Sequence, residues 1–226
     1  MKKSSKMKFE LVPIIDTMCD LYEKPRSLER FQEYISKLQD KKGDMSLPIA
    51  GFNPMAKEHI LDKLAELKDL KAELVIEETI NNLNTTLRDL HNELVIKIVL
   101  NVADDLKGAW TNRYTTDYDS KFKINALVAR KFCTPFFWAS EYYTESLISC
   151  RTLEYAYRTI YWLTIPKPKI LKQHIEQEIY VAMKEETPPV KTEKAEFELL
   201  DEFYSKYLAI CIFMIPLIHV ANVFTI

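Results

Sequence analysis

The feature that most constrains this chain is a run of residues, 72–107, that contains neither proline nor glycine. The first half of the run has one apolar stripe at spacings of three and four residues, which is the pattern of a single helix face. The second half is apolar on nearly all sides, as in a helix that is buried from several directions. We therefore expect one long central helix over 72–107. The stripe consists of Ile76, Ile80, Leu83, Leu87, Leu90 and Leu94.

Glycine is scarce throughout the chain. Only Gly43, Gly51 and Gly108 occur in 226 residues, whereas about 7% glycine is usual. Because β-rich folds use glycine in turns and bulges, this scarcity favours helices. We predict an all-α fold, an irregular helical bundle of about seven helices around the long central helix.

Two capping signals indicate where further helices begin. Ser27 is a good N-cap for a helix that runs to about residue 40. Asn53 followed by Pro54 has the same character, because asparagine caps a helix and proline fits its first turn. The apolar residues of the first of these helices, which we expect to face the core, are Leu28, Phe31, Ile35 and Leu38.

Proline also divides the C-terminal part of the chain. The sequence TPPVK at 187–191 has the composition of a linker, and we expect it to separate a helical domain at 1–186 from a C-terminal helical segment at 192–226 that packs on the domain. The last part, 208–226, carries no Asp, Glu, Lys or Arg and is long enough to span a membrane. Pro216 interrupts it, so we interpret it as a buried helix. The alternative is a tail anchor, which would make the protein membrane-associated.

Composition excludes several classes of function. A net charge of −2 and a pI near 6.1 provide no basic surface for nucleic acid. Three isolated glycines cannot form a Walker A loop, a dinucleotide-binding fingerprint or a nucleophile elbow. None of the four histidines has the spacing of metal ligands. We therefore expect no nucleic-acid partner, no metal and no cofactor, and the dispersed cysteines favour a cytoplasmic location.

The segment 110–122, which follows Gly108, gathers polar and aromatic side chains. Gly108 suits the C-cap of the central helix, and binding residues often lie on loops held by a rigid scaffold. We expect this segment to be a loop that either contributes to a ligand site or serves only as a structured connection. Its candidate ligand-binding residues are Trp110, Asn112, Arg113, Tyr114 and Asp117.

Asn101 and Asp105 continue the direction of the apolar stripe with polar side chains, at helical spacing. Either the end of the helix emerges into solvent there, or the two residues form the floor of a ligand pocket. A buried carboxylate needs a paired charge or several hydrogen bonds. Arg113 follows Asp105 closely enough along the chain to pair with it.

Aromatic residues concentrate at 110–162, a stretch that holds all three tryptophans. Within the helix expected after Pro135, the residues Arg151, Glu154 and Arg158 are spaced by three and four positions. They form an ordinary intrahelical ion ladder, or one arginine faces a cavity and binds an anionic ligand group. The second alternative is chemically reasonable because a guanidinium matches carboxylate and phosphate groups.

Two functional hypotheses follow from these patterns. In the first, the chain is a binding protein or an enzyme for a small polar or anionic molecule, which it holds in an aromatic and polar pocket near residues 101–118. In the second, it is a non-enzymatic interaction protein that is tail-anchored to a membrane through 208–226. No motif identifies a reaction, a particular ligand or an oligomeric state.

Overall fold

The computed structural model of this chain describes residues 7–49, 51–87, 94–106, 111–165, 168 and 171–185. The chain divides into two compact units. The first comprises Met1–Asn112 and Asn125–Tyr155, and the second comprises Arg113–Ile124 and Ala156–Ile226. The expected linker at 187–191 and the segment after it lie outside the described residues.

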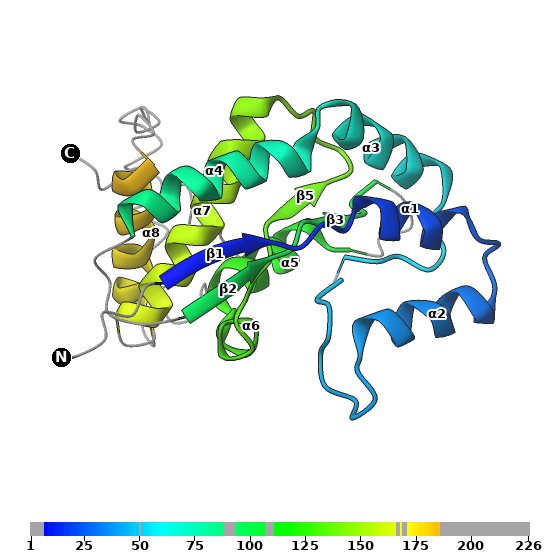
Figure 1. The fold of residues 1–226 in the computed structure, drawn as a ribbon, viewed down its shortest axis with the longest axis horizontal. Coiled ribbons are helices and arrows are strands. Elements are labelled where there is room, and N and C mark those ends of the chain that lie inside the picture. Colours follow the sequence, from blue (N-terminus) through cyan, green and yellow to red (C-terminus); the bar gives the residue numbers. More distant parts are fainter. Residues whose placement is uncertain are drawn as a thin grey trace, which may run out of the picture. The chain divides into compact units, whose positions relative to one another are not determined.

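Parallel β-structure organises the first unit (Figure 1). Strand β1 (Met7–Leu11) pairs with β2 (Leu94–Ile98), which in turn pairs with β4 (Phe132–Cys133). Strands β3 (Asn101–Ala103) and β5 (Phe136–Trp138) follow β2 and β4 along the chain and pair with each other in the same parallel sense.

Two backbone hydrogen bonds join the two ladders. The N–H groups of Val99 and Asn101 donate to the carbonyls of Cys133 and Pro135, both at 2.9 Å. The pairing therefore continues through the interval between β2 and β3. Strand β2 lies between β1 and β4, and β3 continues the same segment along β5.

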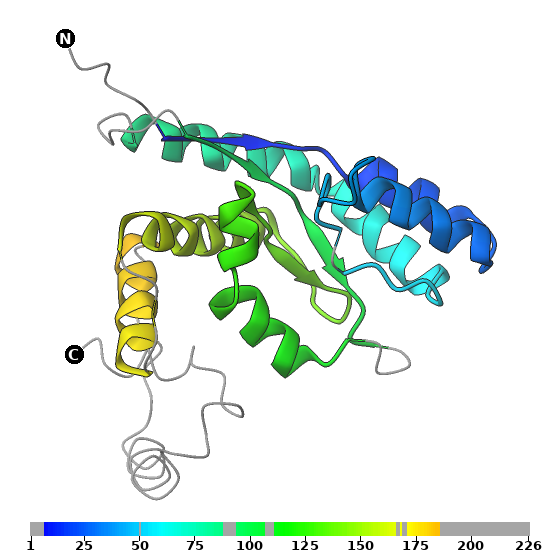
Figure 2. The same ribbon diagram turned by 90° about the horizontal axis from the view of Figure 1, so that it is seen from below.

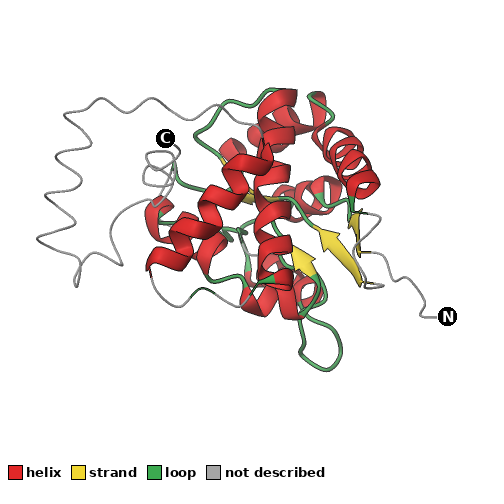
Figure 3. Cartoon of the chain, turned by 90° about the vertical axis from the view of Figure 1, so that its left-hand side faces the viewer, coloured by secondary structure: helices red, strands yellow, loops and turns green. Residues whose placement is uncertain are grey.

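The prediction of an all-α fold is wrong, and so is the single helix over 72–107. Helices and strands are both present (Figure 3). Helix α4 ends at Thr86, and the second half of the run forms β2 and β3. The run 94–103 is almost continuously apolar and rich in β-branched residues, as buried parallel strands are, although Val95 and Lys97 of β2 are exposed. Such a run cannot be distinguished from a buried helix by periodicity alone, and parallel connections need few tight, glycine-rich turns.

Four helices lie between β1 and β2 along the chain, and two more belong wholly or partly to this unit. The four are α1 (Ile15–Glu23), α2 (Leu28–Leu38), α3 (Glu58–Asp69) and α4 (Ala72–Thr86), and the other two are α6 (Asn125–Ala129) and the first part of α7 (Glu145–Thr164).

Helix α4 runs alongside β1 (Figures 1 and 2). The side-chain amide of Asn84 accepts a hydrogen bond from the N–H of Phe9 at 2.8 Å and donates one to its carbonyl at 2.9 Å. Because β1 is the outer strand of its ladder, this amide satisfies backbone groups that a further strand would otherwise bind.

The apolar stripe of α4 faces the core, as expected. Ile76, Ile80, Leu83 and Leu87 are all buried, and they pack in a unit whose strands contribute further buried side chains. Leu90 lies outside the described residues. The buried strand side chains are Phe9, Ile96, Ile98, Val102 and Phe137.

Helix α2 begins where its capping signal predicts, since the Ser27 hydroxyl accepts a hydrogen bond from the N–H of Arg30 at 3.4 Å. The expected orientation is wrong for Leu28 and Phe31, while Ile35 and Leu38 are half-buried. Leu28 is 69% exposed and Phe31 is 41% exposed, whereas Arg30 is fully buried. A charged side chain therefore occupies the inward position of this helix.

The described part of the second unit is helical. It contains α5 (Arg113–Phe122), the last part of α7 and α8 (Leu171–Glu185). The segment 113–122, expected to be a loop, is thus a helix. Among the helices that the structure describes, none combines the length and the apolar character that crossing a membrane requires. The stretch 208–226 lies outside the described residues.

Candidate functional site

The carboxyl ends of the parallel strands in the first unit carry a concentration of polar residues. Strand β1 leads into α1, β3 leads into Asp104 and Asp105, and β5 leads into Ser140 and Glu141. In open parallel sheets, ligands bind outside the carboxyl ends of the strands. The side chains at these ends are therefore the first candidates for a functional site.

Asp104 is the most enclosed acid at these strand ends, with an exposed fraction of 1%. Its Oδ2 atom accepts a hydrogen bond from Asn53 Nδ2 at 2.8 Å and lies 2.8 Å from Nε2 of His59. Its Oδ1 atom accepts the N–H of Leu106 at 3.1 Å. The protein thus holds this carboxylate from several sides.

His59 is oriented by that carboxylate. An ionised carboxylate can only accept hydrogen bonds, so the Nε2 atom of a neutral His59 carries the ring hydrogen and Nδ1 keeps its lone pair. Within the part of the chain that the structure describes, Nδ1 has no hydrogen-bond partner. The His59 side chain is 15% exposed, so the imidazole is partly open to solvent while its partner Asp104 is not.

Asn53 connects this pair to the buried Tyr22. The Asn53 N–H donates to the Tyr22 hydroxyl at 2.9 Å, and the Asn53 Oδ1 atom accepts the N–H of Met55 at 2.9 Å. Burial raises the pKa of the Tyr22 phenol above its ordinary value. Asn53 does not cap a helix directly, because α3 begins only at Glu58.

A glycine fixes the position of this segment against β3. A Cβ atom added to Gly51 would lie 2.3 Å from the carbonyl oxygen of Val102, so only glycine allows the backbone to approach so closely. The Gly51 N–H donates to Asn101 Oδ1 at 3.3 Å, and Asn101 Nδ2 donates to the Val99 carbonyl at 3.3 Å. Asn101, a candidate ligand-binding residue, is fully buried and holds this segment in place.

Asp105, the second candidate on this strand, links two strand ends. Its carboxylate accepts hydrogen bonds from the N–H of Ser140 at 3.0 Å and from the Ser140 hydroxyl at 2.5 Å. The end of β3 is thereby joined to the segment that leaves β5. The expected pairing of Asp105 with Arg113 stays a prediction.

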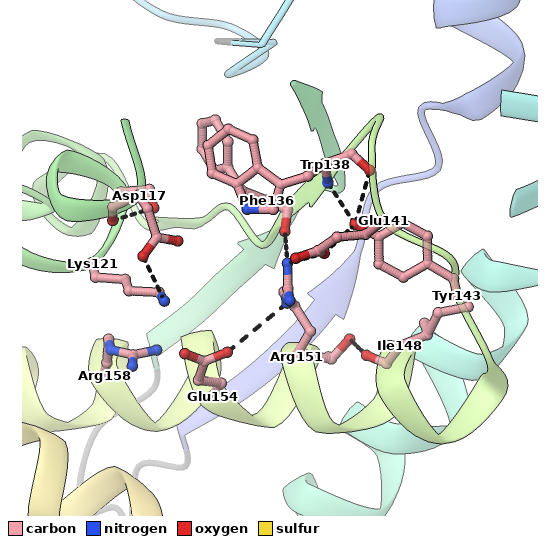
Figure 4. A network of polar contacts seen from close by, with 12 residues as sticks. Asp117, Lys121, Phe136, Trp138, Glu141, Tyr143, Ile148, Arg151, Glu154 and Arg158 are labelled. Carbon is pink, nitrogen blue, oxygen red and sulfur yellow. Dashed lines mark hydrogen bonds and ion pairs between the residues drawn. The ribbon is translucent and has the colours of Figure 1, made fainter. Parts of the chain in front are cut away.

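Arg151, on α7, lies in a polar network that includes Phe136 and Trp138 of β5 (Figure 4). Its Nη1 atom donates to the Phe136 carbonyl at 3.0 Å and lies 3.0 Å from Glu141 Oε2. Its Nε atom is 4.0 Å from Glu154. Burial lowers the pKa of Arg151, but the carboxylates of Glu154 and Glu141 outweigh that effect and raise the pKa overall.

Tyr143 completes this network. Its hydroxyl donates to Glu141 Oε2 at 2.7 Å and accepts the N–H of Trp138 (Figure 4). Burial raises the pKa of the Tyr143 phenol. Of the ion ladder expected along α7, the pair of Arg151 with Glu154 is therefore present, but Arg151 lies closer to Glu141, on the segment after β5.

The remaining candidates fall in or next to the second unit. Arg113 and Tyr114 begin α5 with exposed side chains, and Asn112 just before them is also exposed. Asp117 pairs with Lys121 at 2.9 Å (Figure 4). Trp110 lies outside the described residues.

Arg158, the last of the candidates, is buried in the second unit. It forms a bidentate ion pair with Glu178 on α8, and its Nε atom lies 2.8 Å from Oε1 of that residue. Gln177 donates to Glu178 at 3.0 Å and accepts a hydrogen bond from Trp162 at 2.7 Å. The guanidinium of Arg158 is thus engaged by a carboxylate of the chain itself.

Sequence reasoning missed Asn53, His59 and Asp104 as a group. The signal was the acidic pair that directly follows the apolar run at 94–103, because an acid after a buried parallel strand lies at the carboxyl end of the sheet. Once the run was interpreted as a helix, that position had no special meaning. Within the described ranges, no three His, Cys, Asp or Glu side chains converge as a metal site requires.

Comparisons of the chain with protein-family models, with curated proteins and with solved structures found no match. What the chain does is therefore inferred from its own residues. The group that combines burial, a titratable ring and a position at the carboxyl ends of the strands is Asp104 with His59 and Asn53.

Proposed function

We propose that this chain binds a small polar or anionic molecule at the carboxyl ends of its parallel strands, and that His59 transfers a proton to or from that molecule. One observation carries the proposal. The buried carboxylate of Asp104 lies 2.8 Å from Nε2 of His59, while Nδ1 of the same ring has no partner among the described residues.

The chemistry of such a pair is general acid and base catalysis. Nδ1 accepts a proton from the bound molecule, and the imidazolium that forms is stabilised by the Asp104 carboxylate beside Nε2. The hydrogen bond from Asn53 keeps that carboxylate in position. A positioned proton-transfer group typically contributes about 10²- to 10⁴-fold to a rate.

The test compares His59→Gln with His174→Gln. His174 is a half-buried histidine of α8 in the second unit, so its substitution controls for the loss of an imidazole. Each purified protein is incubated with a cell metabolite extract, and substrates and products are followed by mass spectrometry. The proposal expects a compound that the unaltered protein and His174→Gln convert and that His59→Gln converts about 10²- to 10⁴-fold more slowly. Equal conversion by all three proteins, or none by any, contradicts a proton-transfer role.

A second candidate function is that of a non-enzymatic interaction protein anchored to a membrane through 208–226. The absence of charged residues from that stretch favours it. Fractionation of cells that produce the full chain, or the chain without 208–226, tests it. Recovery of only the full chain with membranes supports an anchor, and equal distribution of the two proteins contradicts one.

A further inference from the structure

Arg30 is an unusual side chain in the first unit. It is fully buried on α2, and the one hydrogen bond that its guanidinium makes to the described residues runs from Nη2 to the carbonyl of Ala56 at 2.6 Å. The Nε and Nη1 atoms are buried and have no hydrogen-bond partner within the described ranges. Together these two atoms carry three N–H donors, and buried donors of this kind are normally satisfied.

No carboxylate balances the charge of Arg30 among the described residues, because none lies within 4.0 Å of its guanidinium. The nearby Glu58 pairs with Arg26 instead, at 2.8 Å. The other buried cations of the described chain each have a carboxylate partner. These cations are Lys63, Lys121 and Arg158.

Aromatic rings provide the immediate surroundings of this cation. The guanidinium carbon lies 4.9 Å from the centroid of the Tyr22 ring and 5.3 Å from that of Phe52. Contacts with ring faces attract a cation, but they accept no N–H hydrogen bond in the guanidinium plane. The charge is thus held in place while most of its directional hydrogen-bonding capacity stays unused.

The same residues lead directly to the proposed site. Tyr22 accepts a hydrogen bond from the N–H of Asn53, and the Asn53 side chain holds the Asp104 carboxylate. The Ala56 carbonyl that binds Arg30 belongs to the turn that starts at Asn53, since the Ala56 N–H donates to the Asn53 carbonyl at 3.1 Å. One short segment therefore contacts both Arg30 and Asp104.

We infer that Arg30 binds an oxyanion, a carboxylate or phosphate group, of the molecule that the protein recognises. A guanidinium matches the geometry of such groups, and the hydrogen bonds are strengthened by the opposite charges. Arg30 is fully buried and binds the Ala56 carbonyl of the turn 53–56, in which Met55 is 65% exposed, so the inference requires this turn to move when the anion binds. The inference rests on the proposed function in one respect: the anion belongs to the molecule that exchanges a proton with His59.

The experiment uses inorganic phosphate and acetate as separate probes, at constant ionic strength set with sodium chloride. Thermal unfolding is measured for the full chain, for Arg30→Met and for Arg130→Met. Arg130 is the matched control, because it is an exposed arginine of the first unit whose partner is Asp44. At about tenfold excess of anion over its Kd, we expect Tm to rise by about 3 to 6 °C in the full chain and in Arg130→Met. Arg30→Met should show no rise.

Whichever anion produces the rise identifies the group as a phosphate or a carboxylate. The absence of a saturable rise with both anions overturns the inference, and so does an equal rise in Arg30→Met. If Arg30→Met does not fold, the Nε–H resonance of Arg30 is followed by NMR in the unaltered chain. A saturable shift of that resonance supports the site, and a resonance that neither anion moves overturns it.

These probes separate the inference from the role of His59. Phosphate or acetate binding that persists in His59→Gln, together with unchanged metabolite conversion by that variant, would support the anion site and contradict proton transfer. Conversion that depends on His59, without anion binding at Arg30, would support proton transfer and contradict the anion site.

Discussion

The Oδ2 atom of Asp104 lies 2.8 Å from the Nε2 atom of His59, although 45 positions separate the two residues. The contact joins the carboxyl end of β3 to the first turn of α3. It depends on the segment around Gly51, which packs against the backbone of β3 and places Asn53 beside the same carboxylate.

Gly51 has no room for a side chain in this arrangement. We expect Gly51→Ala to destabilise the protein by about 1 to 3 kcal/mol, because the new methyl group would overlap the Val102 carbonyl. Chemical denaturation measures this loss.

Gly43→Ala is the control, since a Cβ atom at Gly43 meets nothing within 4 Å and only its positive φ of 79° opposes the change. That strain is worth about 1 to 2 kcal/mol. The stability losses expected for Gly51→Ala and Gly43→Ala overlap in size. The NMR signals of the His59 ring therefore serve to distinguish the two variants. They should change in Gly51→Ala and not in Gly43→Ala, and signals left unchanged by both variants would contradict the positioning role of Gly51.

The stripe of α4 supplies a second prediction. Leu87→Ala should reduce the free energy of unfolding by about 2 to 5 kcal/mol, as core truncations do, because Leu87 is buried. Leu74→Ala, within α4, should change it by less than about 0.5 kcal/mol, because Leu74 is 55% exposed. Similar losses in the two variants, measured by urea denaturation, would contradict the assigned face.

The pH dependence of stability tests the surroundings of His174. Burial lowers the pKa of His174 from its ordinary value of 6.5, and the smaller effect of Glu178 opposes the shift. Its Nδ1 atom is buried with no hydrogen-bond partner in the part of the chain that the structure describes, and its ring contacts Phe122 edge-on at 5.2 Å.

A histidine with a lowered pKa in the folded state binds more protons when the chain is unfolded. The neutral ring therefore makes its full contribution to the free energy of unfolding above the ordinary pKa. That contribution is lost as the pH falls below this value. We expect the unfolding midpoint to fall more steeply for the unaltered chain than for His174→Gln as the pH is lowered from 7.5 towards 5.5. Parallel pH profiles for the two proteins would show that His174 is not responsible.

The start of α2 could be predicted from its capping signal, whereas Asn53 does not cap α3 and the sheet could not be predicted. Ser27 marks the start of α2 correctly because a cap acts through local hydrogen bonds. The strands at 94–103 form a short apolar run, and periodicity alone does not separate such a run from a buried helix. Their pairing partners at 7–11 and 132–138 lie far away in the sequence.

The candidate site could be predicted only in part, because the sequence shows local patterns and not tertiary contacts. Asp105 was singled out as a polar residue at the end of an apolar run, and it does lie at a strand end. His59 and Arg30 were not, because their importance comes from contacts with Asp104 and Tyr22 that only the tertiary fold creates. The burial of Arg30 in place of Leu28 and Phe31 reverses what the pattern of α2 predicts.

The most direct test of the central claim is the tautomer of His59, read from ring nitrogen and proton correlations by NMR. The experiment compares the unaltered chain with Asp104→Asn at a pH where the ring is neutral. The carboxylate of Asp104 should hold the hydrogen on Nε2 and leave the lone pair on Nδ1, and Asp104→Asn should weaken this preference. A ring that carries its hydrogen on Nδ1, or identical spectra for the two proteins, would contradict a His59 that Asp104 prepares for proton transfer.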